Sequence, residues 1–594
     1  MNTEARLVLA VVLMIGVLVG TNLLFPPAPP PETPEEETPV EVAEEPTPAQ
    51  EEEEAPQPPT PEETAEAPPT DPELPGLAPQ EEETQSEVEG TPDELVQDAE
   101  GAERVIRVEG PLYEVTFSDR GARVTSLQLP GFRSFAREGL VELVADPQVG
   151  MLGSRILVAG DTVDLRQAAF QVEPAEGLSL EEGGEPATLT FSYEHPTEPF
   201  SFQVSYRFDP DSYEIHASGR VQGLDRGLLL TDLGRGLAYN EESASAEARE
   251  MAYVGNHIQN GIRTRSLSDV EGAEVDEGPF YWAAVKSQYF VVGALSAPDA
   301  GGAEFFGGII ARGLEFEERP TADVAVTQSL GSTGVFGYRI FAGPQDYQIL
   351  TAVGQDFQQV NPVGWRFIRP ILRPFVGIIT TVLVFLHEFF SVDYGWVLII
   401  FGVSMRILLF PLNHKAMRAQ LRNLAVQPLL KDIQTRYKDE PEKMQKELMK
   451  LYKEHGFNPL AGCWPMLLPW PVLIALFFVF QNTIELRGVP FAWLPDLSAR
   501  DPFFVLPVLL GISMFLMQWI SFRTMDEVNP QMKMMMWLLP IFMVVVFANL
   551  PSGLNLYYLT ANLATLPQSW WIANERKKVQ AKGPPVPVKA KAET

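Results

Sequence analysis

The run Gly395–Leu412, GWVLIIFGVSMRILLFPL, places one arginine inside an apolar segment long enough to cross a bilayer as a helix. An arginine at the centre of a membrane helix costs about 2.5 to 3.5 kcal/mol, and such residues nearly always face a protein interior or a water-filled cavity. Arg406 lies six residues from the end of the run, about 9 Å along a helix. Its side chain can therefore reach the headgroups by snorkelling, and this position alone favours neither reading.

The net charge of −35 comes mostly from one stretch of the 594-residue chain. Pro26–Glu100 contains 25 carboxylates and 19 prolines with no Lys or Arg, and the remainder of the chain carries −10. Such a composition cannot bury enough apolar surface to offset chain entropy, so residues 26–103 are predicted to be a disordered acidic linker. The acidic chain also argues against direct nucleic-acid binding.

An uncharged run of 19 residues, Leu7–Phe25, follows Arg6 near the N-terminus. No small-residue cleavage site follows it, so residues 1–25 are predicted to be an uncleaved transmembrane anchor with a cytoplasmic N-terminus. The single cysteine, Cys463, excludes an internal disulfide framework and a cysteine-based metal cluster.

Residues 104–354 consist of short alternating apolar and polar runs broken by Gly, Pro and Asp, which predicts antiparallel strands in a large β-sandwich. The widely spaced His195, His216 and His257 form no metal-binding pattern, and neither GxSxG nor paired carboxylates are found. We therefore predict no enzyme, no metal and no cofactor. The predicted strands are Tyr113–Phe117, Arg123–Leu129, Thr188–Tyr193, Ser201–Phe208, Tyr213–Val221, Tyr289–Leu295 and Val335–Gly343.

Residues 355–394 are predicted to contain an amphipathic helix, Phe375–Phe390, lying in the outer membrane interface. The reason is topological: Asn413–Gly456 holds ten Lys and Arg against six Asp and Glu, which predicts a cytoplasmic loop. With the N-terminus inside and the β domain outside, only one crossing fits between Gly354 and Asn413. Phe375–Phe390 then cannot span.

The cytoplasmic loop 413–456 has narrow apolar stripes at helical spacing, broken at Lys438–Pro441, which predicts a helical hairpin. Docking of a substrate or partner on this hairpin is a hypothesis, and a solvated connector is its alternative. The candidate docking residues are Ile433, Tyr437, Leu448 and Leu451.

Four more apolar segments complete a five-span core over residues 395–575, followed by a basic cytoplasmic tail, 576–594. Several of them are short, which favours local thinning of the bilayer. The first contains three prolines, and the carbonyls that these leave unpaired are tolerated only beside protein or water. The segments are Leu460–Phe480, Phe503–Ile520, Met534–Ala548 and Leu554–Ile572.

Motifs in this core closely resemble the YidC/Oxa/Alb family of membrane protein insertases, in the Gram-negative form with a large periplasmic domain. The motifs are MRILLFPL (Met405–Leu412), YKEHGFNPLAGCWPMLLPWPV (Tyr452–Val472), IELRGVPFAWLPDLSARDPFFVLPVLLGISMFLMQ (Ile484–Gln518) and LPSGLNLYYLTANL (Leu550–Leu563). The resemblance implies an α-helical insertase core, an N-terminal anchor helix and an all-β, supersandwich-like periplasmic domain.

The resemblance also implies a hydrophilic substrate groove that contains one arginine, here Arg406, together with Gln518, Tyr558 and Asn562. Gly402 departs from a position that is polar in some relatives. No metal and no catalytic residue are implied. Such a protein inserts and helps fold nascent inner-membrane proteins, alone or with the Sec translocon.

The chain has no GxxxxGK[ST] phosphate loop, so we expect insertion to need no ATP and to draw on partitioning of the substrate's apolar helix into lipid. The implied partners are nascent membrane proteins, the Sec translocon, the lipid bilayer and, through the hairpin and basic tail, the ribosome. The expected location is the bacterial inner membrane, with both termini cytoplasmic.

Three other classes of function compete with this interpretation. A transporter with Arg406 as an anion site predicts inverted repeats and polar spans, which are not evident. A carbohydrate enzyme or binder predicts clustered carboxylates or histidines in the β region. A structural assembly factor of the Sec translocon stays open.

Overall fold

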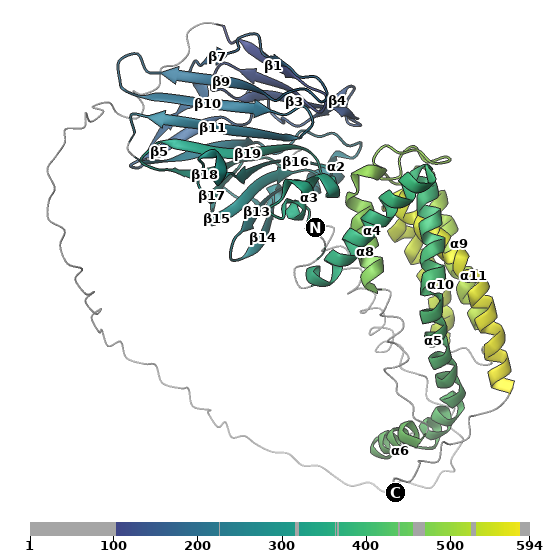
Figure 1. Ribbon diagram of the computed structural model, residues 1–594. Helices are drawn as coiled ribbons and strands as arrows, with labels where there is room; N and C mark the ends of the chain where they lie inside the picture. Colours follow the sequence, from purple (N-terminus) through teal and green to yellow (C-terminus); the bar gives the residue numbers. More distant parts are fainter. Residues whose placement is uncertain are drawn as a thin grey trace, which may run out of the picture. The chain divides into compact units, whose positions relative to one another are not determined.

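The computed structural model describes residues 102–224, 226–314, 320–362, 364, 368–437, 440–454, 470–523 and 530–581 (Figure 1). The predicted anchor, most of the acidic linker and the end of the basic tail lie outside these residues. Figure 1 shows strands from purple to teal, followed along the chain by helices from green to yellow.

The β domain contains two sheets. The smaller has the order β4-β3-β2-β1-β8 and is built from β1 (Val105–Glu109), β2 (Glu114–Ser118), β3 (Val124–Arg133), β4 (Leu140–Glu142) and β8 (Leu178–Ser179). The larger has fourteen strands in the order β6-β5-β12-β18-β17-β15-β16-β19-β11-β10-β9-β7, with β13 paired to β15 and β14 to β13. Its strands are β5 (Ser154–Val158), β6 (Asp161–Asp164), β7 (Gln171–Glu173), β9 (Ala187–Glu194), β10 (Ser201–Phe208), β11 (Glu214–Gln222), β12 (Gly227–Gly234), β13 (Ala252–His257), β14 (Gly261–Ser266), β15 (Ala273–Lys286), β16 (Phe290–Ser296), β17 (Phe306–Gly313), β18 (Ala322–Leu330) and β19 (Val335–Pro344).

All seven strands predicted from alternation are present within one or two residues at each end, apart from β3, which runs four residues further. In β10 every second side chain, from Phe202 to Phe208, is buried, while Gln203 and Arg207 are exposed. Because successive strand residues point to opposite faces, this pattern fixes which face of the sheet meets the core. The antiparallel registers of β10 with β9 and with β11 preserve it across the sheet.

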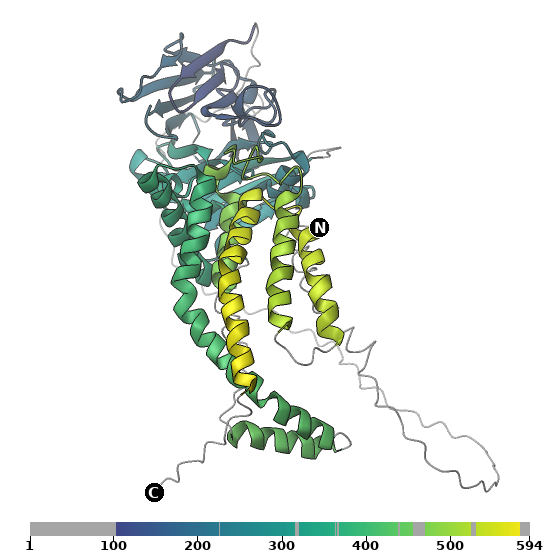
Figure 2. The same ribbon diagram turned by 90° about the vertical axis from the view of Figure 1, so that its right-hand side faces the viewer.

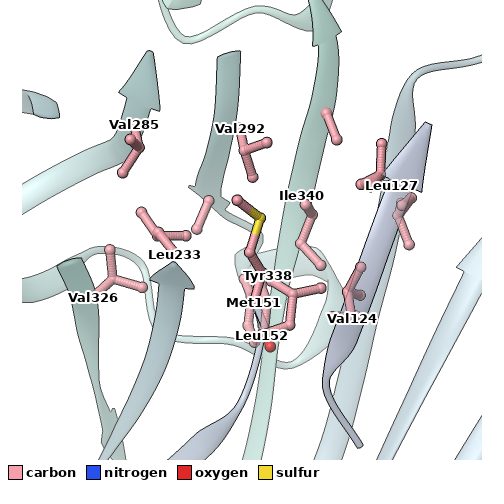
Figure 3. Packing of buried hydrophobic residues seen from close by; sticks show 14 of the residues in the cluster. Val124, Leu127, Met151, Leu152, Leu233, Val285, Val292, Val326, Tyr338 and Ile340 are labelled. Carbon is pink, nitrogen blue, oxygen red and sulfur yellow. The ribbon is translucent and has the colours of Figure 1, made fainter. Parts of the chain in front are cut away.

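The hydrophobic core of the β domain lies between the two sheets. The ring of Phe117 in β2 lies 5.2 Å from that of Phe191 in β9 and 5.3 Å from that of Tyr206 in β10, measured between ring centroids. Figure 3 shows Val124 and Leu127 of β3 beside side chains of the larger sheet, among them Ile340. This face-to-face packing confirms a layered all-β domain.

The strands missed by the sequence analysis include the middle of the larger sheet. Six of the eight residues of β12 are buried, and β18 has five consecutive buried residues. A strand covered on both faces loses the apolar–polar alternation and is difficult to distinguish from other buried segments.

The helical region follows the β domain in the chain. Its helices are α4 (Arg369–Phe390), α5 (Tyr394–Arg436), α6 (Pro441–Glu454), α8 (Trp470–Asn482), α9 (Val505–Phe522), α10 (Pro530–Phe547) and α11 (Ser552–Ala581). Helix α11 packs against α5 and α9, α10 packs against α9, and α4 packs against α8 and α5. A second hydrophobic core joins these helices, with Leu398, Phe401, Leu476 and Tyr557 among its buried members. An all-β domain joined to apolar helices confirms the predicted fold class.

Helix α5 continues without a break from the predicted span into the first arm of the hairpin, over 43 residues. The sequence analysis placed a boundary at Leu412, where the apolar run gives way to charged residues. The change of polarity does not end the helix, and Pro411, one residue earlier, also lies inside it. Figures 1 and 2 both show α6 alongside the C-terminal part of α5, which it contacts.

Helix α4 begins six residues before the predicted amphipathic helix. Its buried face includes Leu372, Ile379 and Leu383, whereas Ile378 and Phe389 are exposed. By length and composition α4 is one of three described helices that are able to cross a membrane, together with Tyr394–Pro411 of α5 and α9. Its interfacial placement stays a prediction.

Candidate substrate site in the membrane helices

Arg406 lies on the face of α5 that packs against α11. It follows Leu398 and Gly402 at intervals of four residues, which places all three on one side of a helix. Leu398 and Gly402 are buried and Arg406 is half-buried, whereas the next two residues, Ile407 and Leu408, are each 70% exposed. The arginine therefore faces a neighbouring helix, and the apolar side chains beside it face outward.

Two tyrosines on α11 lie close enough to Arg406 to interact with it electrostatically. They are Tyr557 and Tyr558. Tyr558 was predicted from the family motif, and its ring lies 5.2 Å from that of Phe547 at the end of α10. Arg406 and Tyr558 thus interact electrostatically across the contact of α5 with α11.

Gly402 allows the close approach of α5 and α11. A Cβ atom at this position would lie 3.3 Å from the Thr560 methyl carbon and 3.5 Å from a ring carbon of Tyr557. This spacing leaves room for little more than a methyl group, and only if Thr560 gives way slightly. The departure from the family pattern at Gly402 therefore coincides with a tight helix–helix contact.

Asn562 is buried between α11 and α9, where its side-chain amide donates a hydrogen bond to the Ser513 hydroxyl over 3.1 Å. The Ser513 hydroxyl in turn donates to the carbonyl of Leu510. Gln518, also on α9, is half-buried and makes no hydrogen bond to Arg406, Tyr558 or Asn562 among the described residues. The four predicted groove residues therefore lie on α5, α9 and α11. Arg406 and Tyr558 interact electrostatically, whereas Gln518 and Asn562 occupy separate positions.

The four predicted docking residues of the hairpin are at least half-buried. Ile433, Tyr437 and Leu448 are half-buried and Leu451 is buried, where α6 contacts α5. The charged residues beside them are exposed, as in the ion pair of Arg436 with Asp432. These four side chains contribute to packing within the hairpin, and only part of each is open to a partner.

Two of the three β-domain histidines cap turns, and the third, His216, is exposed on β11. The Nδ1 atom of His195 accepts from the backbone N–H groups of Thr197 and Glu198, and that of His257 accepts from two backbone N–H groups in the next turn. Across the described ranges, no group of three His, Cys, Asp or Glu side chains is arranged to hold a metal ion.

Sequence reasoning missed two residues of the helical site. Tyr557 packs against Phe401 and Phe480, with both ring centroids 5.8 Å away, and Ser513 is the partner of Asn562. Tyr557 lies next to Tyr558 in the chain, but adjacent helix residues differ by about 100° in direction. Both tyrosines become candidates only once it is known which face of α11 packs against α5.

Comparisons with known proteins cover both regions of the chain. A model of the 60Kd inner membrane protein family matches residues 385–580, and a model of the YidC periplasmic domain matches residues 105–376. The membrane protein insertase YidC of Chlorobium luteolum is 31% identical over 83% of this chain and 87% of its own length. Those of Chlorobium phaeovibrioides and Chlorobium limicola are 30% and 29% identical, each over 80% of this chain and over 84% and 83% of their own lengths. The chain therefore belongs to the YidC family of membrane protein insertases, as a membrane-integral member with a periplasmic domain.

Proposed function

We propose that this insertase, which is not an enzyme, receives polar segments of nascent membrane proteins beside Arg406, between α5 and α11. The observation that carries the proposal is the direction of Arg406: it shares a face with Leu398 and Gly402, and its outward neighbours Ile407 and Leu408 are exposed. An arginine that merely snorkelled to the headgroups would gain nothing from facing Tyr557 and Tyr558.

The physical role of the arginine is to lower the barrier for a short polar tail to cross hydrocarbon. Charged and polar groups are costly in a bilayer core unless protein or water solvates them. A positive charge that interacts with two tyrosines offers acidic tails a polar environment part of the way across. The neighbouring apolar side chains leave the substrate's own helix free to enter lipid.

Gln518 and Asn562 are proposed as secondary members of the same groove. Gln518 is half-buried on α9, which packs against α11, and its amide is able to donate and accept hydrogen bonds. Asn562 is engaged with Ser513, so its contribution to the groove is to position α9 against α11.

The free energy for insertion is proposed to come from partitioning of the substrate's apolar helix, aided by the membrane potential acting on its charges, without ATP hydrolysis. The chain works alone or with the Sec translocon. It is proposed to lie in the bacterial inner membrane with both termini cytoplasmic, because the basic residues of 413–456 favour the cytoplasmic side.

The hairpin is proposed as the first contact for substrate, with Ile433, Tyr437, Leu448 and Leu451 at its apolar seam, and the basic tail as a contact for the ribosome. Photo-crosslinkers at Ile433 and Leu448 should capture a stalled nascent chain. Failure to do so, while crosslinkers at Tyr558 succeed, would remove the docking role of the hairpin.

The test of the groove uses the purified full chain in vesicles without nucleotide and a single-span substrate with an acidic N-terminal tail. We expect Arg406→Ala to lower insertion by about tenfold, equivalent to about 1.4 kcal/mol, and Arg406→Lys to retain most of it. Arg523→Ala is the matched control, because Arg523 stacks on Trp519 at the end of α9 and is not one of the proposed groove residues. Normal insertion of acidic-tailed substrates by Arg406→Ala would refute the proposal.

A further inference from the structure

Arg487 is the most deeply buried arginine side chain in the ion pairs of the described residues, and it is used by neither helix packing nor the candidate groove. It follows the short helix η7 (Ile484–Leu486), in the loop between α8 and α9, and its side chain is 3% exposed. Its Nε donates to Oε1 of Glu241 in the β domain over 2.8 Å. The Glu241 side chain is 11% exposed, so the pair is largely removed from water.

Other β-domain groups surround the same guanidinium. Its Nη2 donates to the backbone carbonyls of Arg133, at 2.9 Å, and Asn240, at 3.4 Å. The guanidinium carbon lies 4.5 Å from the ring centroid of Phe135 and 5.2 Å from that of Phe290. Carboxylate, carbonyls and aromatic faces together satisfy a planar cation in a way that a chance surface contact does not.

The acceptors for Arg487 are themselves positioned by Glu247 in the helix α2 (Ala244–Glu250). Oε2 of this carboxylate accepts from the backbone N–H groups of both Asn240 and Glu241, each at 2.9 Å. Glu247 is fully buried, and burial raises its pKa to about 7. It therefore fixes the segment that supplies both the carboxylate and a carbonyl to Arg487, without touching Arg487.

Two further contacts join the β domain to the helical region near Arg487. The side-chain amide of Gln288, beside β16, donates to the carbonyl of Gln481 at the end of α8 over 3.1 Å. Gly488, directly after Arg487, has a φ of +71°, and a Cβ there would lie 2.8 Å from the Phe135 ring. The positive φ favours glycine at this position, and a side chain there would displace the Phe135 ring.

We propose that the loop Ile484–Ser498 is an internal docking segment, with Arg487 as its anchor and Glu247 as a positioning residue, that holds the β domain at one place on the membrane helices. Removing one partner of a buried ion pair strands the other charge, so release of the loop is strongly disfavoured. The proposal is independent of the groove at Arg406, since it concerns other residues and makes no reference to substrate.

The test measures spin-label distances in the full chain in detergent, with Cys463 replaced by Ser. One label pair joins Asp161 of the β domain to Phe503 after the docking loop, both of which are exposed. A second pair, Asp161 and Glu182, lies within the β domain and reports its integrity. We expect a narrow distribution for the first pair, broadened at least twofold by Arg487→Ala or Glu241→Ala, with no additional broadening in the double variant.

Conservative variants separate anchoring from a general loss of structure. Arg487→Lys keeps the charge but loses the planar guanidinium with its several N–H donors, so its distribution should be broader than that of wild type and narrower than that of Arg487→Ala. Glu247→Gln keeps an acceptor for the two N–H groups and should stay narrow, whereas Glu247→Ala should broaden it. The matched control is Arg500→Ala, an exposed arginine beyond the same loop, which should leave the distribution unchanged.

Two outcomes overturn the proposal. The first is an unchanged interdomain distribution in Arg487→Ala with an intact Asp161–Glu182 distance. The second is broadening by Arg500→Ala equal to that by Arg487→Ala, which would mean that any change near the loop has the same effect. If Arg487→Ala also broadens the pair within the β domain, the comparison of Arg487→Lys with wild type decides, and equal widths would overturn the proposal.

Discussion

The side-chain amide of Asn562 donates a hydrogen bond to the hydroxyl of Ser513, which joins α11 to α9 inside the helical region. Both residues are buried. Asn562, which is predicted to line the groove, thus also makes a hydrogen bond between two helices. We expect Asn562→Ala to lower the free energy of unfolding by about 1 kcal/mol, the usual contribution of one buried hydrogen bond.

Thermal unfolding of the full chain in detergent checks this value, with Leu563→Ala as the matched control, since Leu563 is the next residue and is 50% exposed. Insertion by Asn562→Ala should fall only as far as stability falls. Wild-type stability together with a large loss of insertion would instead make Asn562 a substrate contact.

The close packing at Gly402 should limit the size of the side chain that fits between α5 and α11. Gly402→Ala should have a small effect, because Thr560 needs to move only slightly to accept a Cβ at 3.3 Å, whereas Gly402→Leu should cost about 1 to 3 kcal/mol by overpacking. Thr560→Ala in the same chain should restore part of the loss. Equal damage by Gly402→Leu with and without Thr560→Ala would show that the two residues do not limit the approach.

Glu247 predicts a pH dependence of the stability of the β domain. Its pKa is about 7 in the folded protein, because burial disfavours the charge, and 4.5 without that environment. The folded state therefore binds more protons than the unfolded state between these values, and stability falls as pH rises from 4.5 through 7. The loss is at most about 3 kcal/mol, at 1.36 kcal/mol for each pKa unit.

Unfolding measured at pH 5 and pH 8 tests the sign. Glu247→Gln should flatten the dependence, and Glu242→Gln, an exposed neighbour, should not. Burial also raises the pKa of Glu241, against the opposing effect of Arg487, and raises the pKa of Glu485 to about 7, so a slope of the same sign should remain in Glu247→Gln. A slope unchanged by Glu247→Gln would assign the effect to other groups.

Asp501 predicts a stability effect at the start of α9. Its Oδ1 accepts from the backbone N–H of Phe503 at 3.0 Å and the indole N–H of Trp493 at 3.3 Å, and its Oδ2 accepts from the N–H of Leu506 at 2.7 Å. Asp501 is 1% exposed, so its removal leaves the buried N–H of Leu506 unpaired. Asp501→Ala should cost about 1 to 3 kcal/mol, measured by thermal unfolding. Arg500→Ala should cost far less, and similar losses in both would contradict the capping role.

Sequence alone predicted the class of fold because alternation and long apolar runs are local signals. The strand Ser201–Phe208 was predicted with its observed bounds, since each second residue is buried. Strand β12, which is covered on both faces, gave no such signal. The continuity of α5 through Leu412 was missed because the chain changes from apolar to charged there, directly after Pro411, although the helix runs on.

The candidate site depended on contacts between distant segments, which no local pattern contains. The family motif supplied Arg406 and Tyr558, but the packing of Gly402 on Thr560 and the bond from Asn562 to Ser513 needed the arrangement of α5, α9 and α11. The contacts of Arg487 could not be predicted for the same reason. This residue appears in sequence as one charge in an external loop, and its partner Glu241 is 246 residues away.

That separation sets an order of events during synthesis. At about 5 to 20 residues per second, Arg487 leaves the ribosome about 12 to 50 s after Glu241, which lies 246 residues earlier. The β domain must also reach the far side of the membrane before the loop between α8 and α9 arrives there. Until Arg487 is synthesised, Phe135, Glu241 and Phe290 lack this partner. A β domain that folds early therefore reaches the periplasm with an acidic, aromatic binding site that Arg487 later occupies.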